Sequence, residues 1–172
     1  ISEARRILTG LGLNEAQGQT LISQSEALDM MSETIVRLAN PLSSDMDVLR
    51  PSLLPGLIHS LRHNVSRKNY DMALFEIGRT FINLENGPKE ERHLAIAITG
   101  QRALNFWSGD ERDAKFDAFD LKGIVEEFLE QFGIRGVTFA RRVENSSLFL
   151  ESATIALGGK LPLGELGQLS PP

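Results

Sequence analysis

Residues 40–81 decide the fold, and they read NPLSSDMDVLRPSLLPGLIHSLRHNVSRKNYDMALFEIGRTF. A loop leads through Arg50-Pro51-Ser52 into a helix, and Pro51 and Pro55 are compatible only with its first turn, where amides lack acceptors within the helix. At about 100° per residue, the apolar side chains that follow fall within an arc of roughly 140°. These residues are Leu53, Leu54, Leu57, Ile58, Leu61 and Val65. The sequence therefore predicts a helix with one packing side, followed by a strand over residues 72–77.

The other side of this helix is basic. Arg62, Arg67 and Lys68 lie there or just beyond it, with His59 and His63 beside them. This pattern fits a contact with RNA or an acidic partner, and it also fits a solvated helix face. The histidines are spaced i, i+4, so a metal site is the alternative to two surface histidines.

Three short motifs carry a resemblance to a known family. Residues 40–45 (NPLSSD), 49–57 (LRPSLLPGL) and 75–81 (FEIGRTF) occur in the order and spacing of the bacterial phenylalanyl-tRNA synthetase beta chain, in its catalytic-like core. The resemblance covers essentially all of this chain but only part of that subunit. Residues 1–172 are accordingly expected to form a single domain, a fragment of a longer subunit.

The resemblance implies a class II aminoacyl-tRNA synthetase core: an α+β domain with an antiparallel sheet flanked by helices. In this family the alpha chain charges tRNA with phenylalanine, using ATP and Mg²⁺, within a cytoplasmic heterotetramer. The beta-chain core implied here is non-catalytic, holds no cofactor of its own and docks the alpha chain. The expected interface on the helix is the stripe Leu54, Ile58, Leu61 and Val65, and the excised domain is expected to self-associate through it.

The catalytic candidates are Glu76 and Arg79, which resemble a vestigial nucleotide-binding motif. One arginine is not a phosphoryl-transfer site, because such sites need several cations and usually Mg²⁺. Glu76 in an apolar strand is better explained by a structural ion pair with a nearby arginine. The alternatives are a freestanding nucleotide-binding ligase using Arg79, or a small RNA-binding module using Arg62, Arg67 and Lys68.

Composition narrows the function classes. A net charge of -5 argues against nucleic-acid binding as the dominant activity. The absence of cysteine excludes disulfides and thiolate metal sites. No apolar run approaches the ~20 residues that span a bilayer, so no membrane association is expected.

The remaining predicted elements give an α+β pattern. An acidic group, Asp110, Glu111 and Asp113, is either a solvated loop or a carboxylate metal site. Asp117 is a predicted N-cap for a second long helix that stops at Gly133. A helix is predicted from Ser2, stopped by Gly12, and a helical turn over 25–31. Strands are predicted over 20–23, 34–39, 79–84, 94–98, 137–143, 148–157 and 160–169, with Gly158-Gly159 as a hairpin turn. Residues 72–84 form either two strands or one bent at Gly78, and residues 94–98 are expected to be covered on both faces.

Overall fold

The computed structural model describes residues 1–28, 34–102, 113–143 and 148–170. Its contacts divide the chain into two compact units. The first unit comprises Ile1 and Gly12–Thr99, and the second comprises Ser2–Leu11 and Gly100–Pro172. That residues 1–172 act as a single domain stays a prediction. None of the helices in the described ranges is both long and apolar enough to cross a membrane.

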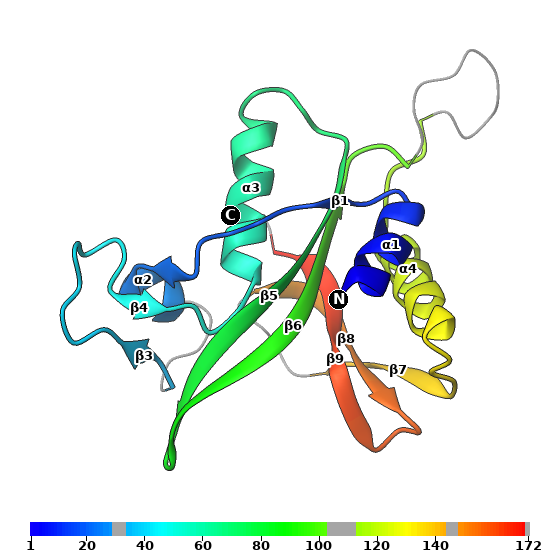
Figure 1. Cartoon of the computed structure of the whole chain (residues 1–172). Coiled ribbons are helices and arrows are strands. Elements are labelled where there is room, and N and C mark those ends of the chain that lie inside the picture. Colours follow the sequence, from blue (N-terminus) through cyan, green and yellow to red (C-terminus); the bar gives the residue numbers. More distant parts are fainter. Residues whose placement is uncertain (29–33, 103–112, 144–147, 171–172) are drawn as a thin grey trace. The chain divides into compact units, whose positions relative to one another are not determined.

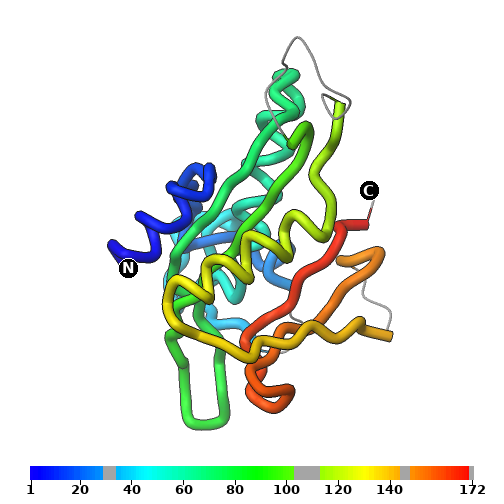
Figure 2. The backbone as a smooth tube through the Cα atoms, turned by 90° about the vertical axis from the view of Figure 1, so that its right-hand side faces the viewer, coloured from blue at the N-terminus to red at the C-terminus, as the bar shows by residue number. Residues whose placement is uncertain are grey.

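A long antiparallel hairpin is the centre of the first unit (Figures 1 and 2). Strand β5, Met72–Leu84, pairs with β6, Gly87–Thr99, without interruption from Met72↔Thr99 to Leu84↔Gly87. Of the two readings that the sequence left open, one continuous strand is correct. A short strand, β1, Asn14–Glu15, pairs in parallel with β5 on its other edge.

Residues 94–98, in β6, are less buried than predicted from the sequence. Residues 94–98 are all half-buried, so the prediction that they are covered on both faces is wrong. The physical reason is their position: in the sheet order β1-β5-β6, β6 is the edge strand within the described part of the chain. Such a strand keeps part of its surface accessible even when its side chains are apolar.

A second small sheet in the first unit has the order β2-β4-β3. Its strands are β2, Leu21–Ile22, β4, Val48–Leu49, and β3, Val36–Arg37. Together with α2, Gln24–Leu28, it encloses a core of Ile22, Ala27 and Val48, against which Ile35 packs. This sheet positions the chain that runs from β4 into the central helix.

The central helix, α3, spans Leu54–Val65 and packs on β5 and β6 (Figure 1). Pro55 lies in its first turn, as predicted. The N-cap residue, Leu53, makes no capping hydrogen bond with its side chain. Instead, Ser52 Oγ accepts a hydrogen bond from the Leu54 amide at 3.2 Å. The entry motif therefore supplies the acceptor that the helix start lacks.

The second unit contains two helices and an antiparallel sheet in the order β7-β8-β9. Helix α4 contacts both β9 and the first helix, α1. At the predicted hairpin turn, Gly158 and Gly159 have φ of 58° and 68°, a conformation that glycine adopts without strain. The elements are α1 Ser2–Gly10, α4 Ala118–Gln131, β7 Val137–Arg141, β8 Phe149–Leu157 and β9 Leu161–Leu169. The predicted α+β class, with antiparallel sheets and helices, is confirmed.

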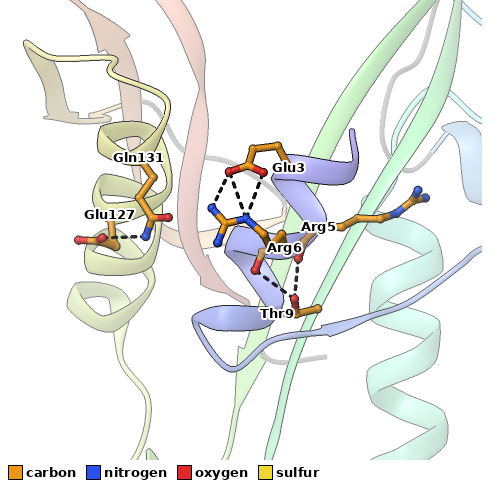
Figure 3. Close-up of polar contacts among 6 residues, drawn as sticks. All are labelled: Glu3, Arg5, Arg6, Thr9, Glu127 and Gln131. Carbon is orange, nitrogen blue, oxygen red and sulfur yellow. Dashed lines mark hydrogen bonds and ion pairs between the residues drawn. The ribbon is translucent and has the colours of Figure 1, made fainter.

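Local polar contacts hold the ends of both helices of this unit. Figure 3 shows Arg6 paired with Glu3 one turn earlier on α1, and Gln131 donating to Glu127 on α4 at 2.9 Å. The hydrogen bond from Arg6 lowers the pKa of Glu3 below its usual value. Asp117 caps α4 as predicted, accepting from the amides of Phe119 and Asp120. The cap at Asp117 is a local contact, which is why the start of α4 could be predicted from the sequence, whereas α1 ends at Gly10, two residues before the predicted stop at Gly12.

Candidate docking surface and the ion pair beneath it

The predicted interface stripe on α3 changes in exposure along the helix. Leu53 and Leu57, which belong to the predicted apolar arc but not to the predicted interface stripe, are 2% and 0% exposed. Leu54, Ile58 and Leu61 are half-buried, and Val65 at the end of the helix is 39% exposed. The structure therefore brings the four predicted residues together on one stripe, part of which stays accessible.

The predicted RNA-contact residues surround the C-terminal end of α3. Arg62, Arg67 and Lys68 are all exposed. Arg67 Nη1 donates to the backbone oxygen of His63 at 3.2 Å. Within the described residues, no ion pair joins any of these three cations to a carboxylate. Positive charge at a helix C-terminus is favourable in itself, because it complements the partial negative charge of the unpaired carbonyl groups.

A buried ion pair lies where the chain enters α3. Arg50 Nη1 and Glu76 Oε1 are 2.6 Å apart, and both side chains are almost fully buried, at 6% and 4% exposure. Arg50 Nε also donates to the backbone oxygen of Arg79 at 3.0 Å. The other carboxylate oxygen, Glu76 Oε2, is buried and accepts no hydrogen bond from a described group. The predicted structural ion pair at Glu76 is thus confirmed, and its partner is Arg50.

Glu76 and Arg79 do not form a common site. Their positions differ by three residues on a strand with uninterrupted pairing, so their side chains project to opposite faces of the sheet. Arg79 is mostly exposed and forms a 3.1 Å ion pair with Glu90 on the neighbouring strand. The arginine that resembled a nucleotide-binding residue therefore lies apart from the glutamate with which it was grouped.

A second group of polar side chains lies on β5 and β6, nearer to the hairpin tip than the buried pair. Thr80, which is 2% exposed, shares a 2.7 Å hydrogen bond with His93 Nδ1. The other ring nitrogen of His93 lies 3.6 Å from Glu91. Glu91 also pairs with Lys89 at 2.6 Å, and this hydrogen bond holds the pKa of Glu91 below its usual value. The hydroxyl of Thr80 is enclosed, so it is not accessible as a nucleophile.

The exposed features of this site are an apolar stripe and a group of cations on α3 and just after it. Among the described residues, no three histidine, aspartate or glutamate side chains gather where they could hold a metal ion. Asp110 and Glu111 of the predicted acidic group lie outside the described residues. The surface of α3 offers instead an apolar stripe beside a basic end, a combination suited to a macromolecular partner.

Sequence reasoning missed Arg50 and the short strands β1 and β4. The sequence did contain a sign that Arg50 forms a buried ion pair. Arg50 directly follows the apolar residues Val48-Leu49, and Glu76 directly follows Leu74-Phe75. Opposite charges in two such runs are candidates for a buried pair. No comparable signal marked β1 or β4, because two-residue strands carry no periodicity.

The chain is similar to proteins of a known family. Residues 1–172 match the family described as phenylalanyl tRNA synthetase beta chain CLM domain. The phenylalanine–tRNA ligase beta subunit of Bacillus cereus is 36% identical over 176 aligned positions, covering 98% of this chain and 22% of that protein. The corresponding subunit of Listeria innocua is 38% identical over 178 positions, with the same coverage of both. The chain thus spans about a fifth of the length of these relatives.

Among solved structures, the pyrrolysyl tRNA synthetase of Desulfitobacterium hafniense is similar in fold. It aligns with a TM-score of 0.68 at 20% sequence identity, covering 94% of this chain and 52% of that chain. At this identity the similarity concerns the fold alone. It agrees with the class II synthetase-like fold expected from the sequence.

Proposed function

Because the chain belongs to the phenylalanyl-tRNA synthetase beta chain CLM domain family, we propose that it is a non-catalytic core domain that docks the catalytic alpha chain of phenylalanine–tRNA ligase through α3. The observation that carries this proposal is the graded exposure of the α3 stripe. The helix is fixed to its own sheet by Leu53 and Leu57, while Val65 is 39% exposed. The same helix can then pack against its own core on one side and contact a partner chain on the other.

The spacing of the stripe suits a second helix. Leu54, Ile58, Leu61 and Val65 are separated by four, three and four residues, which is the spacing of a seam that packs at a shallow angle. The proposed assembly is a heterotetramer of alpha and beta chains in the cytoplasm. In isolation, the domain is proposed to pair with a copy of itself or to aggregate, because the same apolar stripe then lacks its partner.

Catalysis is assigned to the alpha chain, together with the ATP and Mg²⁺ that charging of tRNA requires. The separation of Arg79 from Glu76 supports this assignment, since transition-state charge in phosphoryl chemistry needs several converging cations. The domain is expected not to exchange pyrophosphate with ATP in the presence of phenylalanine. The rival function, a nucleotide-binding ligase using Arg79, would appear as stabilisation by ATP, about 2.7 kcal/mol at one hundred times its Kd.

Docking through α3 can be tested with two adjacent positions on the helix. Ile58→Glu places a carboxylate in the stripe, whereas His59→Glu introduces the same side chain at the exposed neighbouring residue. In a full-length beta subunit carrying this sequence, Ile58→Glu should weaken alpha-chain affinity at least about tenfold, because an interfacial charge without a partner is costly. His59→Glu should leave affinity within about twofold, as expected for a residue outside the buried contact.

Folding is monitored by circular dichroism, since Ile58 is half-buried. Val65→Glu repeats the test at a position that is 39% exposed and tolerates a charge better in the free subunit. If Ile58→Glu and Val65→Glu both fold and bind the alpha chain with wild-type affinity, the interface lies elsewhere. Complete failure of the wild-type subunit to bind the alpha chain would exclude the docking function itself.

A second contact is proposed for the basic end of α3. Arg62, Arg67 and Lys68 are exposed and, within the described residues, lack carboxylate partners, which favours their contacting phosphate groups of tRNA in the whole enzyme. Replacing one of them by glutamine should reduce the salt dependence of tRNA binding by about one unit of slope. Lys89→Gln serves as a control, because Lys89 already pairs with Glu91. An unchanged slope for all three variants would assign these residues to a solvated helix face.

A further inference from the structure

We propose that the buried Arg50–Glu76 pair is a positioning device for α3, which sets the direction of the helix and thereby its affinity for the docking partner. The inference rests on the docking function proposed above. It assigns a role in docking to Arg50 and Glu76, neither of which belongs to the helix.

Arg50 is held by four groups from two segments, strand β5 and the chain just before β2. Its side chain pairs with Glu76 at 2.6 Å and donates to the Arg79 oxygen at 3.0 Å. Its amide donates to the Thr20 oxygen at 3.0 Å, and its own oxygen accepts from the Phe81 amide at 2.9 Å. The residue that precedes Pro51 is therefore fixed both to β5 and to the segment before β2. The starting point of α3 follows from these contacts, because only three residues separate Arg50 from Leu54.

Three backbone segments meet near the pair, and each has a glycine there; at Gly18 and Gly78, though not at Gly56, the approach is too close for a larger residue to fit without a shift. A methyl group built on Gly18 would lie 3.0 Å from Glu76 Oε2, and one on Gly78 would lie 2.3 Å from Arg50 Nη2. A methyl group on Gly56, in the first turn of α3, would lie 3.6 Å from the Cα atom of Gly18. The strand, the helix and the segment before β2 thus meet at the ion pair, which acts as the common spacer between them.

A contribution to stability alone does not account for this pair. Two charges buried together lose their hydration, and well-packed apolar side chains of similar volume are often equally stable or more so. Here one carboxylate oxygen also remains without a hydrogen-bond donor among the described groups, which adds to the cost. What the pair provides that apolar side chains lack is direction, since each guanidinium hydrogen bond fixes an angle as well as a distance.

The length of α3 amplifies a small change at its start. Its 12 residues span about 18 Å, so a tilt of about 10° at the ion pair would move the far end by about 3 Å. Val65 lies at that far end, where the stripe is most exposed. Where the side chains of one helix pack into the grooves of another, a displacement of this size removes much of the shape complementarity.

The decisive variant replaces both charges by apolar side chains, Arg50→Met with Glu76→Leu, in a full-length beta subunit carrying this sequence. We expect it to fold and to bind the alpha chain at least about tenfold more weakly than wild type, with faster amide hydrogen exchange over residues 54–65. Glu90→Gln is the matched control. It breaks the exposed Arg79–Glu90 pair on the same hairpin and should leave both quantities within about twofold.

The outcomes separate the inference from the docking function. If the wild-type subunit binds the alpha chain and the folded double variant binds it with the same affinity, the positioning role is wrong and the docking function stands. Wild-type subunit that does not bind excludes docking. Should the double variant fail to fold, Gly18→Ala decides, because its methyl group presses on the carboxylate without removing any charged group. A folded Gly18→Ala subunit is expected to bind at least about threefold more weakly, and unchanged affinity would count against the positioning role.

Discussion

Lys68 follows α3 in the left-handed backbone conformation, with φ of 65°, and its amide donates to the oxygen of Val65 at 2.9 Å. The next amide, of Asn69, donates to the oxygen of Asn64 at 3.1 Å. This pair of bonds closes the helix in a Schellman motif, whose left-handed position is usually glycine. The helix end thus carries a lysine where the backbone favours a residue without a side chain.

Lys68→Gly should therefore stabilise the chain by about 1 kcal/mol, because it removes the steric cost of the left-handed conformation. Chemical denaturation measures the free energy of unfolding. Lys68→Ala is the control, since it removes the charge but keeps the strained backbone, and it should not stabilise. A loss of stability in Lys68→Gly would mean that the lysine side chain contributes more than the strain costs.

Two leucines of α3 should respond differently to truncation. Leu57→Ala removes a fully buried side chain, 0% exposed, and should cost on the order of 2 to 5 kcal/mol of unfolding free energy. Leu61 is only half-buried, so Leu61→Ala should cost less in the free domain, roughly 1 to 2 kcal/mol. Equal losses at the two positions would show that the stripe is covered in the free domain.

Two glycines near the ion pair make a matched test of close packing. A methyl group at Gly78 would meet Arg50 Nη2 at 2.3 Å and Leu53 Cδ2 at 2.8 Å, so Gly78→Ala should destabilise the fold by about 1 to 3 kcal/mol. At Gly56 the nearest atoms lie at 3.6 and 3.8 Å. Gly56→Ala should be neutral or stabilise by up to about 1 kcal/mol, because alanine is the better helix former. Thermal unfolding of both variants measures their stabilities, and Gly78→Ala should be the less stable of the two.

The cap of α4 provides a test in the second unit. Asp117 accepts hydrogen bonds from the amides of Phe119 at 2.7 Å and Asp120 at 3.0 Å, and Asp117→Ala should cost about 1 kcal/mol. Glu126→Ala breaks the exposed pair with Lys122 and should cost no more than about 0.5 kcal/mol. Helicity and unfolding free energy are measured for both, and a larger loss in Glu126→Ala would contradict the capping role.

What the sequence predicted correctly was local in origin. The period of α3, the cap at Asp117 and the two glycines at 158 and 159 each act within a few residues of themselves. The charged half of β6, Pro88–Arg92, was not predicted as strand, because its pairing with β5 imposes an extended backbone on residues that carry no strand pattern. Arg50 and Glu76 lie 26 residues apart, and such a contact leaves only the weak signal of two isolated charges.

The last prediction concerns the energetics of that contact. Arg50→Met and Glu76→Leu, made singly, should each cost about 3 to 5 kcal/mol, because each leaves the opposite charge buried without its partner. The double variant should cost far less than the sum, since no charge remains to be desolvated. A double-mutant cycle of unfolding free energies measures the difference, and residues in direct contact at 2.6 Å should give strong coupling. Additive effects would mean that water reaches Arg50 or Glu76 once the other is removed, so that the two charges are not held as an enclosed unit. Strong coupling with a stable double variant would show instead that folding does not depend on the pair, which is the condition under which its effect on docking can be measured separately.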